Sequence, residues 1–267
     1  MDKLRHLLPA LGALGVLALL ALTTRVPAEW PLFGASAAIV VVAVSFFLRP
    51  QGEHVPKPVA SWIAVALPLA VLCLATGVLL LFLTTSVARQ WLLVVTASLI
   101  GLSWQSWRRY SWDRERYHPE ELENVLLAVE LMAVWTLAGA GYRLLLDPSV
   151  LPAPFSEAAY LVATITIVIA VALLQRYALW SKRYPRERVW PFMVVTVLLT
   201  SELFWVLNFL PHAPMVKSFL VAAVYYTLIM LGRAHFDQTL SRTVVRRYLW
   251  FVVGVLTLVL ATAQWVV

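Results

Sequence analysis

The sequence predicts an all-α fold: a polytopic transmembrane helix bundle of nine spans, with the N-terminus inside and the C-terminus outside. Composition is the first of three observations behind this prediction. Of the 267 residues, 61% are hydrophobic and only 13% are charged, whereas soluble domains carry about 25% charged residues. The second is that the apolar residues form runs of the roughly 20 residues that a helix needs to cross a bilayer. The third is that lysine and arginine alternate between rich and poor loops along the chain.

Each apolar run is expected to be a helix, because lipid offers no hydrogen-bond partner to an exposed backbone. The predicted spans are 7–24, 30–48, 59–83, 87–107, 122–146, 157–179, 189–210, 215–232 and 248–267. The predicted outside loops are short and the inside loops are longer, and the fifth span follows Pro119, Glu120 and Glu121, residue types favoured in a helical first turn. Proline-rich or basic loops bound the later spans. No loop is long enough to fold alone, so we expect one integral membrane domain covering residues 1–267.

The distribution of basic residues predicts the orientation. If every lysine and arginine is assigned to its nearest loop, 17 fall on one side of the membrane and 4 on the other. Cytoplasmic loops hold the positive excess, so this count places the N-terminus inside. An alternative is that Lys3, Arg5 and the first apolar run form a secretory signal cleaved near Val26-Pro27-Ala28, which would leave eight spans. The length of the run and the proline beside the scissile bond argue against cleavage.

Topology also accounts for the net charge of +7, so no nucleic-acid partner is implied. The lipid bilayer is the partner that the composition requires. Arg242, Arg246 and Arg247 precede the last span, where they could contact anionic lipid. The simpler interpretation, that they only fix topology, is favoured.

Two acidic residues, Glu130 and Glu202, lie well away from the ends of the predicted spans, where ionisable groups are costly and mark candidate functional sites. Glu202 lies about 20 Å from the inner face at 1.5 Å per residue. Tyr225 and Tyr226 of the next span are expected at a similar depth, and Trp205 and Asn208 follow on the same helix. These five residues form the candidate intramembrane polar site. They would suit a proton-coupled transporter or, equally, an inert clamp between helices.

Glu130 is the second intramembrane acid, and it is expected nearer the inner face. Gln175 and Arg176 in the following span lie at a matching depth. A hydrogen bond or ion pair among these side chains would hold two helices together, and this structural role is the preferred interpretation. Glu130, Gln175 and Arg176 are therefore the candidate structural pair.

Recognisable catalytic and metal-binding patterns are missing from the sequence. It contains no phosphate-binding glycine loop, no His-Glu-x-x-His zinc motif and no Gly-x-Ser-x-Gly elbow. The single cysteine, Cys73, offers no cluster of soft metal ligands, and the histidines lie in loops or at span edges. We therefore expect no catalytic residues, no metal and no cofactor, and an enzyme is disfavoured.

The seventh and eighth spans carry a short pattern: Glu202-x-x-Trp205, then Leu210-Pro211, then Tyr225-Tyr226. It resembles uncharacterised multi-spanning membrane proteins of Chloroflexi and candidate-phyla bacteria, over roughly the last third of the chain. The resemblance implies a bacterial cytoplasmic membrane location and points first to Glu202, Trp205 and Pro211. It implies no activity.

The leading functional hypothesis is a membrane scaffold or partner subunit with a protein partner in the membrane, because two intramembrane acids occur without a catalytic set. The alternative is a small proton-coupled transporter in which Glu202 carries the proton. A lipid-active enzyme comes third.

Overall fold

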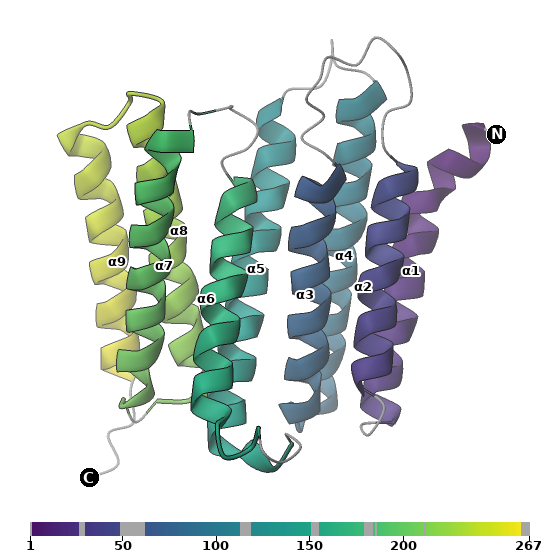
Figure 1. Ribbon diagram of the computed structural model, residues 1–267, viewed down its shortest axis with the longest axis horizontal. Helices are drawn as coiled ribbons and strands as arrows, with labels where there is room; N and C mark the ends of the chain where they lie inside the picture. The colour runs from purple at the N-terminus through teal and green to yellow at the C-terminus, as the bar shows by residue number, and fades with distance from the viewer. Residues whose placement is uncertain are drawn as a thin grey trace. The chain divides into compact units, whose positions relative to one another are not determined.

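The computed structural model describes residues 2–26, 30–48, 62–112, 119–150, 155–178, 184, 186–210 and 212–262, and the long elements in these residues are all α-helices (Figure 1). Strands are absent from this described part of the chain. The helices are α1 (Asp2–Arg25), α2 (Trp30–Phe47), α3 (Trp62–Phe82), α4 (Ser86–Trp112), α5 (Pro119–Leu146), α6 (Ala159–Ala178), α7 (Arg186–Asn208), α8 (Pro214–Phe236) and α9 (Arg242–Thr262). A short 3₁₀ turn, η2 (Pro148–Val150), follows α5.

The predicted all-α fold is confirmed, and each of the nine predicted spans coincides with one helix. Seven of the helices in the described residues are long and apolar enough to cross a membrane. Of the other two, α2 is a shorter apolar helix, and α9 begins with a basic turn. Residues 59–61, 179 and 263–267 of the predicted spans, and Pro211, lie outside the described residues. The inside-to-outside orientation stays a prediction.

The chain divides into two compact units, Met1–Ala133 and Val134–Val267, and each is described by itself. Unit 1 holds α1 to α4 and the first part of α5. Unit 2 holds the rest of α5 and α6 to α9. The expectation of a single membrane domain stays a prediction.

In unit 1, α1 packs against both α2 and α4. The contact with α4 requires a glycine at position 12, because a Cβ there would lie 2.6 Å from Cζ3 of Trp104. The buried Trp104 indole donates a hydrogen bond to Ser45 Oγ on α2 at 2.9 Å. A second buried hydrogen bond, 3.2 Å between the hydroxyls of Thr76 and Thr96, joins α3 to α4. Side-chain hydrogen bonds of this kind help to hold helices together in lipid.

In unit 2, helices that follow one another along the chain are neighbours: α6 contacts α7, α7 contacts α8 and α8 contacts α9. Close approach of α8 to α7 again depends on a glycine. A Cβ on Gly232 would lie 2.1 Å from Cζ of Phe192. The Phe192 ring also meets Phe236 edge to face, with the centroids 5.5 Å apart. Both contacts lie toward the start of α7 and the end of α8.

The end of α8 is closed by a Schellman motif. The amide of Thr239 donates to Ala234 O at 2.9 Å, and the amide of Gln238 donates to His235 O at 3.1 Å. Gln238 has a φ of 57°, in the left-handed region that usually takes glycine. The motif turns the chain sharply before α9 begins at Arg242.

Candidate functional site

Glu202 lies on the exposed face of α7. At 1.5 Å per residue it is about 24 Å from the start of the helix at Arg186 and about 9 Å from its end, so the carboxyl lies well inside the apolar segment. The buried face of α7 is formed by Thr196, Thr200, Phe204 and Leu207, which follow one another at helical spacing. Glu202 points away from that face and therefore away from the interior of unit 2.

The neighbours of Glu202 on the exposed face are large and apolar. Trp205, Val206 and Phe209 are 48%, 53% and 68% exposed, at positions i+3, i+4 and i+7 from the glutamate. The Trp205 and Phe209 rings meet edge to face with centroids 5.0 Å apart. We call Glu202, Trp205, Val206 and Phe209 the Glu202 face. It is a carboxyl in an otherwise apolar, aromatic surface.

Tyr225 and Tyr226 of α8 do not join this face. Tyr225 is fully buried, whereas Glu202 is exposed. Tyr226 is half-buried and turns toward α9, where its ring lies 6.2 Å from that of Tyr248 and 5.8 Å from that of Phe251. Adjacent residues on a helix point about 100° apart, so the two tyrosines serve different contacts. The structure thus brings Glu202 and Trp205 together and leaves the two tyrosines elsewhere.

Asn208, the fifth residue of the candidate site, ends α7, where its backbone carbonyl accepts a hydrogen bond from Nζ of Lys217 at 3.2 Å. The last carbonyls of a helix lack partners within it. In α7, the carbonyls of Val206 and Leu207 accept hydrogen bonds from the backbone amides of Phe209 and Leu210. The side chain of Lys217 donates to the following carbonyl, that of Asn208. A cation at a helix C-terminus also interacts favourably with the helix dipole. Lys217 is therefore a cap supplied to α7 by α8.

Tyr142 of α5 completes this cluster. Its ring stacks on Phe204 with centroids 4.4 Å apart, and its hydroxyl donates to the backbone carbonyl of Phe204 at 2.9 Å. The ammonium of Lys217 lies 5.5 Å from the centroid of the Tyr142 ring, within the range of a cation–π interaction. Lys217 and Tyr142 are both buried. These contacts fasten the last turns of α7 to α5 and α8.

The sequence alone did not single out Lys217 or Tyr142 as partners of α7. One signal was available: Lys217 is one of only four basic residues assigned to the predicted outer side. A lysine kept on the side that is poor in positive charge is expected to have a structural reason, and helix capping supplies one.

Glu130 and Gln175 are both buried, at 1% and 0% exposure. Arg176 is exposed on α6. Neither amide atom of Gln175 has a hydrogen-bond partner among the described residues. Glu130 belongs to unit 1 and Gln175 to unit 2, and the pairing between them stays a prediction.

The three arginines before the last span, Arg242, Arg246 and Arg247, are all exposed in the first turns of α9. Their contact with anionic lipid stays a prediction. Among the described residues, no group of three histidine, cysteine, aspartate or glutamate side chains is arranged to hold a metal ion. Cys73 is buried in α3 with a free thiol.

Comparisons with protein-family models, with curated proteins and with solved structures found no match to this chain. The resemblance to bacterial multi-spanning proteins therefore stays a prediction.

Proposed function

We propose that this integral membrane protein is a partner subunit of a membrane complex, and that its Glu202 face receives a transmembrane helix of another protein. The observation that carries the proposal is the exposure of Glu202 beside Trp205, Val206 and Phe209 on an otherwise apolar face of α7. We expect the complex to reside in a bacterial cytoplasmic membrane, as the resemblance in the last third of the chain implies.

The surroundings of the Glu202 carboxyl are energetically costly for an acidic side chain. An acidic residue at the centre of a transmembrane helix costs about 2.5–3.5 kcal/mol on insertion scales, and Glu202, which lies about 9 Å from the end of α7, carries part of this cost. Such residues therefore normally face a bundle interior or a water-filled cavity. Glu202 faces outward, and in the absence of a partner its carboxyl would meet lipid. A neighbouring helix with a hydrogen-bond donor or a basic group at the same depth would lower this cost.

The partner helix is further constrained by the other members of the face. Apolar side chains are exposed over about one turn of α7, at Trp205, Val206 and Phe209. Such a surface suits the van der Waals packing that dominates helix association in lipid. The α7 helix is also the least enclosed of the seven candidate spans, with 22% of its most apolar window buried. Its surface therefore has room for a helix from another chain.

The alternatives receive less support. A proton-coupled transporter using Glu202 would need the carboxyl to line a path through the protein, and an outward-facing side chain does not favour such a path. A lipid-active enzyme would need polar groups converging on one site. Glu202, Tyr225 and Tyr226 instead lie on different helix faces.

Site-specific photocrosslinking in native membranes tests the proposal. A photoreactive amino acid at Val206 should yield a protein adduct, whereas one at Ile165, which is similarly exposed on α6, serves as the matched control. The crosslinked peptide should map to a membrane helix that carries a donor or basic residue. Glu202→Leu should abolish the Val206 adduct, and Glu202→Gln, which still forms hydrogen bonds, should keep most of it.

Three results would contradict the proposal. The first is an adduct to lipid alone at Val206. The second is equal protein adducts at Val206 and Ile165, which would indicate random collision. The third is an adduct only to a second copy of this chain, which would indicate self-association instead of a subunit role.

A further inference from the structure

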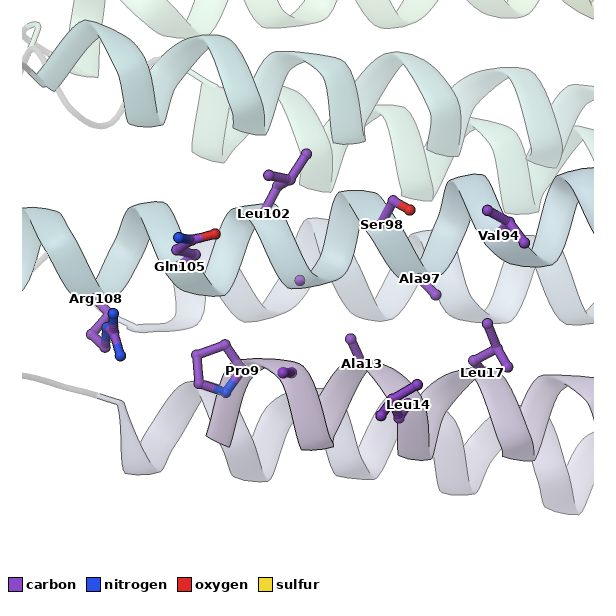
Figure 2. A pocket seen from close by; sticks show the side chains of 12 residues that line it. Pro9, Ala13, Leu14, Leu17, Val94, Ala97, Ser98, Leu102, Gln105 and Arg108 are labelled. Carbon is purple, nitrogen blue, oxygen red and sulfur yellow. The ribbon is translucent and has the colours of Figure 1, made fainter. Parts of the chain in front are cut away.

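A groove of about 780 Å³ runs between α1 and α4 in unit 1. Figure 2 shows its lining side chains, with α1 on one side and α4 on the other. On α1 they are Pro9, Ala10, Ala13, Leu14 and Leu17, and on α4 Val94, Ala97, Ser98, Gly101, Leu102, Gln105 and Arg108. Its volume lies within the range of about 300–1,000 Å³ that is typical of small-molecule sites.

Small residues create the hollow. Ala97, Ser98 and Gly101 line the groove within about one turn of α4, and Ala10 and Ala13 line it on α1. A Cβ on Gly101 would lie 3.5 Å from Cβ of Ala13, an ordinary contact, so the two backbones approach without filling the space beside them. Leu14, Leu17, Val94 and Leu102 add further apolar lining.

The length of the groove matches one leaflet of a bilayer. From Val94 to Arg108 the α4 helix rises about 21 Å. Half of a hydrocarbon core is about 15 Å, and the polar headgroup region adds about 5–7 Å on each side. An apolar chain lying along the groove would therefore reach from near the bilayer centre to the headgroup level at Arg108.

The two ends of the groove differ in chemistry. Val94 and Leu17 lie at one end, and Gln105 and Arg108 lie at the other, beside Pro9 (Figure 2). The Arg108 guanidinium carries a positive charge and five N–H donors, which suit a phosphate group. Gln105 adds an amide donor about one turn further along the groove. An amphiphile with an apolar tail and an anionic phosphate headgroup complements both ends.

We propose that this groove is a binding site for an anionic glycerophospholipid, with one acyl chain lying between α1 and α4 and the phosphate held by Arg108 and Gln105. The predicted orientation assigns the lipid to the cytoplasmic leaflet, where anionic lipids concentrate. This site is independent of the Glu202 face, which belongs to unit 2.

Native mass spectrometry of the full chain, released from nanodiscs, provides the test. Nanodiscs with equal amounts of phosphatidylglycerol and phosphatidylcholine should leave one phosphatidylglycerol preferentially bound to the wild-type protein. Arg108→Gln should weaken this retention at least about fivefold, the factor that corresponds to about 1 kcal/mol per basic residue near a membrane surface. Arg109→Gln is the matched control, since it removes the same charge from an adjacent, exposed residue that does not line the groove. We expect its retention to stay within about twofold of wild type.

A second variant tests the acyl-chain part of the site. Ser98→Leu adds bulk at an exposed groove position without entering the helix contact, so it should reduce phosphatidylglycerol retention while the helical content stays unchanged. Glycerol 3-phosphate, which carries the phosphate without acyl chains, should not displace the bound lipid at millimolar concentration. The proposal would be overturned by equal retention of the two lipids, by equal effects of the two arginine variants, by full retention in Ser98→Leu, or by displacement with glycerol 3-phosphate.

Discussion

The contact between Gly232 and Phe192 gives a sharp prediction about stability. In Gly232→Ala, the new Cβ would lie 2.1 Å from Cζ, 2.5 Å from Cε1 and 2.7 Å from Cε2 of the Phe192 ring. An ordinary contact begins at 3.4 Å, so the ring edge would have to move by more than about 1 Å. Displacements of this size in a filled interior cost about 1–3 kcal/mol.

Gly254→Ala provides the matched control for this substitution. Gly254 is an exposed glycine in α9 of the same unit, and nothing lies within 4 Å of the position its Cβ would take. Alanine is a better helix former than glycine by about 1 kcal/mol, so this variant should be as stable as wild type or more stable. The propensity gain is common to both variants. The difference between the unfolding free energies of the two variants therefore isolates the steric cost. Gly232→Ala should be less stable than Gly254→Ala by about 1–3 kcal/mol.

Reversible unfolding in mixed micelles of a mild detergent and sodium dodecyl sulfate, followed by circular dichroism, would measure both free energies. Combining Gly232→Ala with Phe192→Leu should recover part of the loss, because the smaller side chain can leave the new methyl group room. Equal unfolding free energies for the Gly232 and Gly254 variants would refute the close approach of α8 to α7 and, with it, the packing described for unit 2.

Four further predictions follow from particular contacts. Lys217→Met should destabilise the protein by about 1–2 kcal/mol, because it leaves the Asn208 carbonyl without its donor, whereas Lys217→Arg should keep most of the stability in the same unfolding assay. Trp104→Phe should cost about 1 kcal/mol, and a double-mutant cycle with Ser45→Ala should show coupling between the two residues; additive losses would exclude their hydrogen bond. Gln238→Gly should raise the midpoint of unfolding by relieving the left-handed backbone, and a lower midpoint would argue against the Schellman motif. Reporter fusions at the two termini should place the N-terminus inside and the C-terminus outside, and a shared compartment would contradict the positive-inside assignment.

The sequence predicted the positions of the helices well, because a span is defined by its length and apolar composition. The predicted segment 30–48, for example, corresponds to α2 at Trp30–Phe47, and 122–146 lies within α5 at Pro119–Leu146. Where the ends differ, the helices mostly extend past the apolar run. Pro119, Glu120 and Glu121 form a helical first turn before the fifth apolar run begins, and α7 starts at Arg186 ahead of the seventh.

The orientation of each helix about its axis was not predictable, because a helix that is apolar on every side has no preferred buried face. We expected Glu202 and Tyr225 to share one polar site, because the rise along their spans gives them a similar depth. Glu202 is exposed and Tyr225 is buried instead. The difference depends on how Phe204 and its neighbours pack, which is a long-range property. The α1–α4 groove was hidden for the same reason, since small residues such as Gly101 stand out only when two helices are placed side by side.

The seam that joins α1 to α4 has a consequence for biogenesis. The Trp104 ring of α4 packs against Gly12 of α1, and α1 leaves the ribosome before α4 is synthesised. Before α4 is present, the side of α1 that carries Gly12 lacks its contact with Trp104. The contact between α1 and α4 in unit 1 can therefore form only after α2, α3 and α4 have all been synthesised.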